Sequence, residues 1–182
     1  MKRITEIWWQ KCLLDKQKIE HWLISLYNNE LDAKERFLDF AEKYCQEDVE
    51  SYKIFLEIAA QEAKHAILVE NIIKNRGLTI YVKSSKTGRY WLQTLKCIED
   101  KMTAAAIGAY AEGLSLKRMR IIINNVNTPV DLRELFKIIE PEESYHAKIL
   151  QKIAKKYGMS KVRECHNKGL EALGLKIIIS NR

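Results

Sequence analysis

The short pattern Glu-x-x-His occurs twice in the chain, at Glu62–His65 and at Glu143–His146. Residues three apart in a helix lie on the same face, so each pattern can point a carboxylate and an imidazole at one spot. A lone glutamate precedes each pattern, Glu30 by 32 residues in the first case and Glu112 by 31 residues in the second. The matched spacing indicates a twofold internal repeat.

One carboxylate from each of two helices, with a Glu-x-x-His from each of two others, is the ligand set of a di-iron site in a four-helix bundle. Carboxylate oxygen combined with imidazole nitrogen suits iron or manganese better than a metal that prefers sulfur. Without metal, four ionised carboxylates in an apolar core would be very costly. We therefore predict a site for two iron ions, with manganese as the alternative. The predicted ligands are Glu30, Glu62, His65, Glu112, Glu143 and His146.

Four long amphipathic segments carry these residues. Apolar residues recur at steps of three and four over about residues 16–44, 48–75, 91–124 and 130–157, which predicts four helices. Only 7 glycines and 2 prolines punctuate the chain, as expected for long helices.

The connections between these helices define the topology. Residues 78–90 are predicted to form a crossover, partly extended, and about residues 160–173 a last helix on the outside. We predict an all-α protein with a ferritin-like four-helix bundle, in which two helical hairpins are joined by a long crossover and followed by an extra C-terminal helix. Residues 1–182 are predicted to be a single ferritin-like di-iron domain.

The sequence leaves alternative roles for several residues near the predicted ligands. Glu140, one turn before Glu143, is predicted to be a supporting acid or a partner of Lys137 rather than an additional ligand. Pro141 is predicted to kink its helix. It is either a harmless bend or a helix start, or a distortion that opens the metal face to oxygen or substrate. Three tyrosines are either hydrogen-bond donors and redox relays near the metals or ordinary packing residues: Tyr27, Tyr110 and Tyr145.

Other residues are predicted to be structural. The glutamates predicted to face solvent are Glu35, Glu57 and Glu142. The histidines His21 and His166 lack a partner pattern and are predicted to lie on the surface or in packing contacts. The tryptophans predicted to pack in the core or between helices are Trp8, Trp9, Trp22 and Trp91.

Composition restricts the class of protein. The 4 cysteines are scattered without a Cys-x-x-Cys, which disfavours a zinc knuckle, a rubredoxin-type site and a disulfide framework, and a reducing cytoplasm is the expected location. No run of eighteen apolar residues predicts a membrane helix, so no membrane partner is expected.

The formal net charge of +7 is uneven along the chain. It is either a solvated helix surface or a face that binds a polyanion such as RNA. The basic residues considered for RNA are Lys83, Lys86, Arg89, Lys152, Lys155, Lys156, Lys161 and Arg163.

The pattern resembles the ferritin-like di-iron carboxylate proteins over about residues 16–157. Within that superfamily, Glu30–Ala41 resembles the first helix of rubrerythrin. Gln61–His65, Gly108–Arg118 and Glu143–His146 followed by Ala-Lys-Lys-Tyr157 resemble the tRNA hydroxylase that acts on methylthio-isopentenyl-adenosine. This resemblance implies an O2-dependent di-iron monooxygenase that hydroxylates a modified tRNA nucleoside, with tRNA, O2 and an external electron donor as partners.

Other members of the superfamily remain as alternatives. Rubrerythrin-like proteins carry a further glutamate three residues after the position of Glu112, where this chain has Ser115, and the chain has no Cys-x-x-Cys electron-transfer motif. Six ligands resemble an oxygenase site with an open position. The alternatives are a rubrerythrin-like peroxide reductase, an iron-binding or storage bundle, and a di-iron oxygenase acting on a lipid-like or aldehyde substrate. The oligomeric state is left open, with an oligomer as one possibility.

Overall fold

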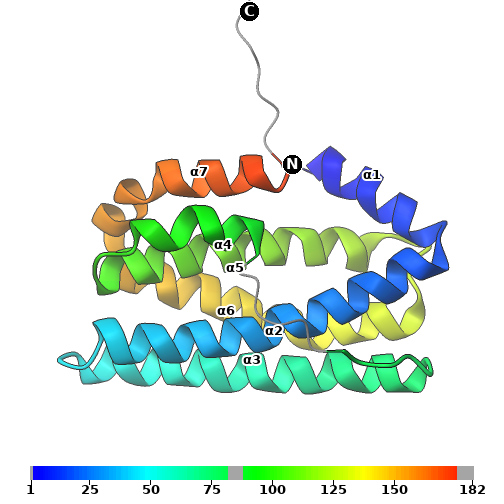
Figure 1. The fold of residues 1–182 in the computed structure, drawn as a ribbon, viewed down its shortest axis with the longest axis horizontal. Helices are drawn as coiled ribbons and strands as arrows, with labels where there is room; N and C mark the ends of the chain where they lie inside the picture. The colour runs from blue at the N-terminus through cyan, green and yellow to red at the C-terminus, as the bar shows by residue number, and fades with distance from the viewer. Residues whose placement is uncertain (1, 82–87, 176–182) are drawn as a thin grey trace, which may run out of the picture.

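Four long helices form the body of the protein in the computed structural model, which describes residues 2–81 and 88–175 (Figure 1). They are α2 (Lys16–Tyr44), α3 (Val49–Asn75), α5 (Lys101–Asn124) and α6 (Val130–Lys161). α2 pairs with α3 and α5 pairs with α6 in two hairpins that pack against each other. This arrangement confirms the predicted all-α, ferritin-like bundle.

Three shorter α-helices and one 3-10 helix lie around this bundle. α1 (Lys2–Leu13) precedes α2, and α4 (Arg89–Thr94) precedes α5 through the 3-10 helix Leu95–Cys97. α7 (Arg163–Ala172) is the last helix among the described residues. α7 packs against α4, so the predicted C-terminal helix lies outside the bundle (Figure 1). The helix α1 was not predicted.

The helix predicted over residues 91–124 is in fact two helices, α4 and α5. The chain between them is extended at Ile98, and Asp100 then caps α5 by accepting a hydrogen bond from the backbone N–H of Thr103. The Thr103 side chain in turn interacts with the backbone N–H of Asp100, which completes a capping box. Two local signals, Asp100 and Thr103, therefore override the apolar periodicity that runs across the break.

The predicted kink at Pro141 is also displaced. Pro141 lies inside α6, but the residue of that helix with non-helical backbone angles is Lys155, with a φ of 52° and a ψ of −177°. Beyond this break Gly158 lies against α5, where a Cβ would stand 2.5 Å from the carbonyl oxygen of Met102. The close approach of α6 to α5 thus requires glycine at position 158.

Two hydrophobic clusters fill the bundle on either side of its middle. The first contains Phe37, Phe55, Ile107 and Leu150, and the second contains residues of the opposite ends of the same helices. The buried members of the second cluster include Trp9, Leu23, Val69, Ile73, Leu132 and Phe136. The predicted ligands fall between the two clusters along each helix, so a buried polar layer separates them.

The cysteines differ from the prediction. Cys97 and Cys165 form a disulfide that joins the 3-10 helix to α7, whereas Cys12 and Cys45 are free and buried. The two bonded positions are 68 residues apart, and only the packing of α7 on α4 brings them together.

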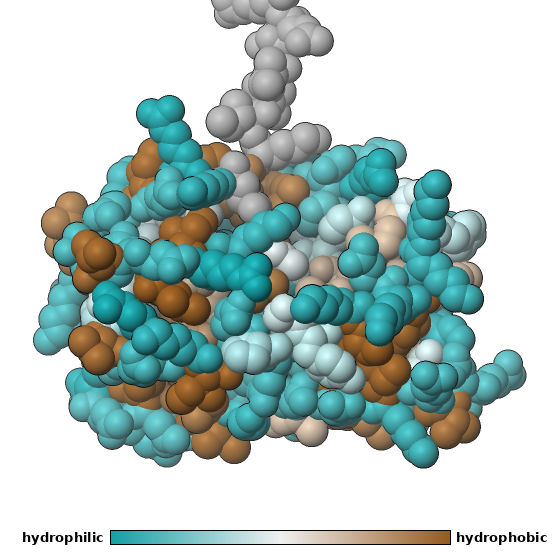
Figure 2. All heavy atoms as spheres, turned by 180° about the vertical axis from the view of Figure 1, so that it is seen from behind, coloured by the Kyte–Doolittle hydropathy of each residue, from teal (hydrophilic) through white to brown (hydrophobic). Residues whose placement is uncertain are grey.

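The outer surface mixes apolar and polar residues. On the face opposite to that of Figure 1, hydrophobic residues form small patches separated by hydrophilic ones (Figure 2). Within the described ranges, none of the helices combines the length and the apolar character that crossing a membrane requires.

Candidate metal centre

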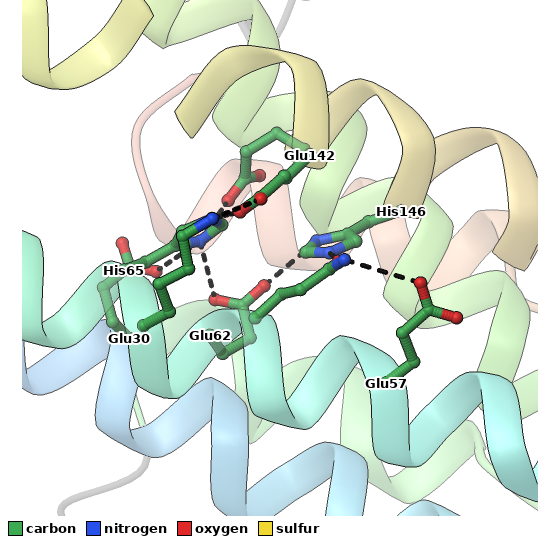
Figure 3. A network of polar contacts seen from close by, with 9 residues as sticks. Glu30, Glu57, Glu62, His65, Glu142 and His146 are labelled. Atoms are coloured by element: carbon green, nitrogen blue, oxygen red, sulfur yellow. Dashed lines mark hydrogen bonds and ion pairs between the residues drawn. The ribbon is translucent and has the colours of Figure 1, made fainter. Parts of the chain in front are cut away.

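All six predicted ligand residues converge in the polar layer between the two hydrophobic clusters. Glu30 comes from α2, Glu112 from α5, and each Glu-x-x-His from α3 or α6. None of the six is more than 9% exposed, and both histidines are fully buried. Figure 3 shows Glu30, Glu62, His65 and His146 turned toward one another in the interior.

The six residues form two overlapping groups in which one ligand atom per residue lies within 4.8 Å of the others. The first group is Glu30, Glu62, His65 and Glu143. The second group is Glu62, Glu112, Glu143 and His146. Two carboxylates, Glu62 and Glu143, belong to both groups. This arrangement fits a di-metal site in which Glu62 and Glu143 would serve both ions and each ion would have its own glutamate and histidine.

The polar atoms inside this cluster test whether a metal fits. Glu62 Oε1, Glu143 Oε2 and the Nδ1 atoms of both histidines are buried without a hydrogen-bond partner. His146 Nδ1 lies 3.1 Å from Glu62 Oε1, and His65 Nδ1 lies 3.6 Å from Glu143 Oε1. Buried polar atoms are rarely left unpaired, and oxygen and imidazole nitrogen are the donors that iron or manganese takes. These residues therefore fit two such ions.

Burial raises the pKa values of two carboxyl groups in this cluster, those of Glu30 and Glu143. Burial raises the pKa of Glu30 to about 8, and burial together with the charges of Glu112 and Glu62 raises the pKa of Glu143 well above its usual value. The metal-free site therefore retains protons at neutral pH, and metal binding must release them.

Glu62 and His65 behave as a charged pair in the same cluster. Burial alone would raise the pKa of Glu62, but the nearby imidazoles of His146 and His65 outweigh the effect of burial and lower the pKa to about 2. Burial alone would lower the pKa of His65, but the nearby carboxylates of Glu30 and Glu62 raise it to about 10. In the metal-free protein, the imidazolium therefore supplies part of the positive charge that the carboxylates need.

A second layer of residues orients the two histidines. His65 Nε2 is 2.8 Å from Glu142 Oε2, and His146 Nε2 is 2.6 Å from Gln61 Oε1. If each Nε2–H donates, the Nδ1 lone pair faces the cluster, as a metal ligand requires. Each acceptor immediately precedes the Glu-x-x-His of the opposite helix, so α3 and α6 support each other's histidine.

The role of Glu142 corrects its sequence assignment. Glu142 is not solvent-facing: it contacts both His65 and Lys64, because its position on α6 lies over the contact with α3 (Figure 3). Glu140 does not pair with Lys137 either. It accepts from Arg120 of α5 at 2.7 Å, whereas Lys137 bonds Glu134.

The three tyrosines occupy different surroundings. Tyr27 packs against the second hydrophobic cluster, and Tyr145 is 37% exposed with its hydroxyl 3.4 Å from Glu57. Tyr110 donates to the carbonyl of Met159 and stacks on His166, with ring centroids 4.1 Å apart. These contacts account for all three as packing or surface residues, and His166 is a packing residue as predicted.

A cavity of about 390 Å³ reaches the carboxylates from the side of α2 and α5. Glu30, Glu62, Glu112 and Glu143 all line it, and neither histidine does. Its other walls include aromatic rings, two arginines of the bundle and small side chains. Those wall residues include Trp8, Trp22, Ala33, Arg36, Trp91, Ser115 and Arg118.

All four tryptophans pack as predicted, and three of them also line the cavity. Trp9 is fully buried and donates to Thr128. Trp8, Trp22 and Trp91 pack against the two hydrophobic clusters and line the cavity as well. A sequence signal was present in the internal repeat. Glu30 and Glu112 are each followed by a small residue at the third position and by an arginine at the sixth, in Glu-Leu-Asp-Ala-Lys-Glu-Arg36 and Glu-Gly-Leu-Ser-Leu-Lys-Arg118.

The bundle and its buried carboxylate and histidine cluster define a ferritin-like di-iron protein. Residues 23–118 match the Rubrerythrin family, and this stretch includes Glu30, Glu62, His65 and Glu112. The chain therefore belongs to the rubrerythrin family. No curated protein and no solved structure matches the chain.

Proposed function

We propose that this protein is a di-iron oxygenase that hydroxylates the isopentenyl side chain of a modified adenosine in tRNA. The observation that carries the proposal is the cavity of about 390 Å³ that opens onto all four carboxylates. Cavities of this size hold small organic molecules. Reduction of peroxide needs access for a far smaller molecule.

In the proposed reaction one oxygen atom of O2 enters a C–H bond and the other leaves as water. Two electrons from an external donor and two protons complete the balance. Two bound iron ions would supply the redox chemistry that activates O2. The six residues of the cluster would hold these ions, and Glu142 and Gln61 would fix the orientation of the histidines.

The chain's own residues also shape access to the centre. At position 115 the small Ser115 lines the cavity, so this wall leaves room for a substrate group next to Glu112. The apolar side chains of Leu26, Met119 and Ile122 line the same cavity and exclude water around an apolar group. This setting favours an unactivated carbon as the atom that reaches the carboxylates.

The tRNA part of the proposal rests on cationic side chains. Arg36, Arg89 and Arg118 line the cavity and can attract a polyanion to it. Of the basic residues considered from sequence, Arg89 alone lines it among the described residues; Lys83 and Lys86 lie outside the described ranges. The basic residues of α6 and α7 considered from sequence are not part of the cavity wall.

The decisive experiment is mass spectrometry of tRNA nucleosides from cells with the chain, cells without it, and cells carrying the Glu62→Ala/Glu143→Ala variant. We expect the isopentenylated adenosine to gain one oxygen atom only with the native chain. The family match favours peroxide reduction as a second function. Unmodified tRNA in all three samples, with iron-dependent consumption of hydrogen peroxide by the purified protein, would establish that second function instead.

A further inference from the structure

Two arginine–tryptophan pairs face the cavity, and they follow the internal repeat. The Arg36 guanidinium lies 4.1 Å from the ring centroid of Trp91, and the Arg118 guanidinium lies 5.0 Å from that of Trp8. All four residues line the cavity and all four are partly exposed. Each pair therefore contributes an aromatic ring and a flat cation to the wall of the same space.

The pairs cross between the two halves of the repeat. Trp8 lies 22 residues before Glu30, and Trp91 lies 21 residues before Glu112, so α1 and α4 occupy equivalent places ahead of the two halves. The tryptophan of each half packs on the arginine of the other. The internal repeat thus includes the outer helices, and they bring an equivalent pair to the cavity from each half.

Further aromatic rings support both pairs. The ring of Trp22 lies 5.9 Å from that of Trp8, and the ring of Tyr90 lies 5.5 Å from that of Trp91, both in edge-on contact. Trp22 and Tyr90 also line the cavity. These four aromatic side chains, together with Phe136, line the cavity that reaches the carboxylates.

The guanidinium of Arg36 has an unused hydrogen-bond donor. Its Nε atom is buried and has no hydrogen-bond partner. The guanidinium lies in the field of Asp32, Glu112, Glu62 and Glu30, and it remains charged because arginine does not lose its proton in proteins. When two divalent ions neutralise the four glutamates of the cluster, Arg36 leaves a positive charge in the cavity for an acceptor on the ligand.

We propose that these two arginine–tryptophan pairs are the recognition site for a planar heteroaromatic ring, whose apolar substituent then points at the glutamate cluster. The proposal rests on the proposed function for the choice of an adenine ring. Unstacked bases bind to aromatic rings and to arginine planes while their edges accept hydrogen bonds. An alkyl chain would use neither the flat cation nor its free N–H.

The test is equilibrium binding of N6-isopentenyladenosine to the iron-loaded protein kept anaerobic, followed by calorimetry and by tryptophan fluorescence. The comparison ligand is the five-carbon prenyl alcohol, which has the same tail and no ring. We expect the nucleoside to bind and the alcohol to bind at least about tenfold more weakly, since it lacks the stacking and the hydrogen bonds.

The matched variants are Arg36→Met and Arg118→Met, with Lys117→Met as the control because Lys117 is exposed beside Arg118 and does not line the cavity. We expect each arginine variant to weaken nucleoside binding about tenfold and the control to leave it unchanged. Arg36→Lys is not expected to restore binding, since lysine lacks the flat fork. Iron content and circular dichroism confirm that each variant is folded and loaded.

The outcomes separate this inference from the proposed function. Nucleoside binding that is equal in all four variants, or no tighter than binding of the alcohol, would overturn the recognition site even if tRNA mass spectrometry shows hydroxylation. Ring-dependent binding that both arginine variants weaken supports the site, even if no hydroxylated nucleoside forms. Absence of nucleoside binding by the native protein also overturns the site.

Discussion

The two halves of the internal repeat place the same residues around the metal centre, yet they support them differently. In one half His65 faces the carboxylate of Glu142, and in the other His146 faces the amide of Gln61. The third position after the lone glutamate also differs, with Ala33 in the first half and Ser115 in the second. A carboxylate makes the histidine that donates to it more basic than an amide does. The comparison indicates two metal positions with the same ligand types and different surroundings.

The largest effect is expected from the carboxylates that both halves share. Glu62→Ala/Glu143→Ala should abolish binding of both ions, because these two residues belong to both ligand groups. Glu30→Ala should retain one ion more readily, because Glu30 belongs to one group only. Elemental analysis after iron reconstitution measures both. Equal loss of iron in the two proteins would show that the halves do not share ligands as the structure implies.

Substitution of the residues that accept from the two histidines, Glu142 and Gln61, should have the next largest effect on metal binding. Glu142→Ala removes the acceptor of His65, and loss of such a supporting residue typically lowers metal affinity 10–100-fold. We expect one of the two ions to be weakened. Gln61→Glu should make the two positions more alike by giving His146 a carboxylate acceptor as well. Competition with a chelator resolves the two affinities, and two affinities unchanged by either substitution would contradict the inequivalence.

The metal-free protein should lose stability as the pH rises. The folded-state pKa of Glu30 is raised, by burial, from 4.5 to about 8, and that of His65 is raised, through its carboxylate partners, from 6.5 to about 10. A group with a raised pKa stabilises the fold fully below its unfolded pKa and loses that contribution as the pH passes its folded pKa.

The expected window for this loss therefore runs from about pH 4.5 to 10. Thermal unfolding of the apo protein over that range measures it. The iron-loaded protein, whose ligands carry no displaceable protons, is the control and should change far less up to neutral pH. An apo protein that becomes more stable between pH 7 and 9 would contradict these protonation states.

The smallest effect is expected at Gly113, because the equivalent position of the other half does not hold a glycine. Gly113 follows Glu112 in α5, where the first half has Leu31, and a Cβ at Gly113 would meet nothing within 4 Å. Gly113→Ala should stabilise the protein by up to about 1 kcal/mol through helix propensity. Denaturant unfolding measures the change, and iron content should not alter. Gly158→Ala is the contrast, because its Cβ would stand 2.5 Å from the Met102 carbonyl oxygen and should destabilise the fold.

The parts of this molecule that follow from local pattern were predictable from the sequence. The four bundle helices follow from apolar periodicity, and the grouping of Glu30, Glu112 and the two Glu-x-x-His patterns follows from spacing within helices. The break between α4 and α5 was missed because the periodicity continues across a capping box at Asp100.

What the sequence alone did not provide depends on contacts between helices. The hydrogen bond from His65 to Glu142 joins residues 77 apart, and nothing in the neighbourhood of Glu142 marks it as an interhelical acceptor. The cavity walls needed the docking of α1 and α4, which brings Trp8 and Trp91 onto arginines of the opposite halves. The assignment of residues 1–182 to one domain remains a prediction.

The most direct test of this account is a crystal structure of the iron-loaded protein with anomalous diffraction at the iron edge. We expect two iron peaks, one beside Glu30 and His65 and the other beside Glu112 and His146, with Glu62 and Glu143 between them. A single peak, or iron bound away from this cluster, would contradict the two-metal centre on which the proposed chemistry depends.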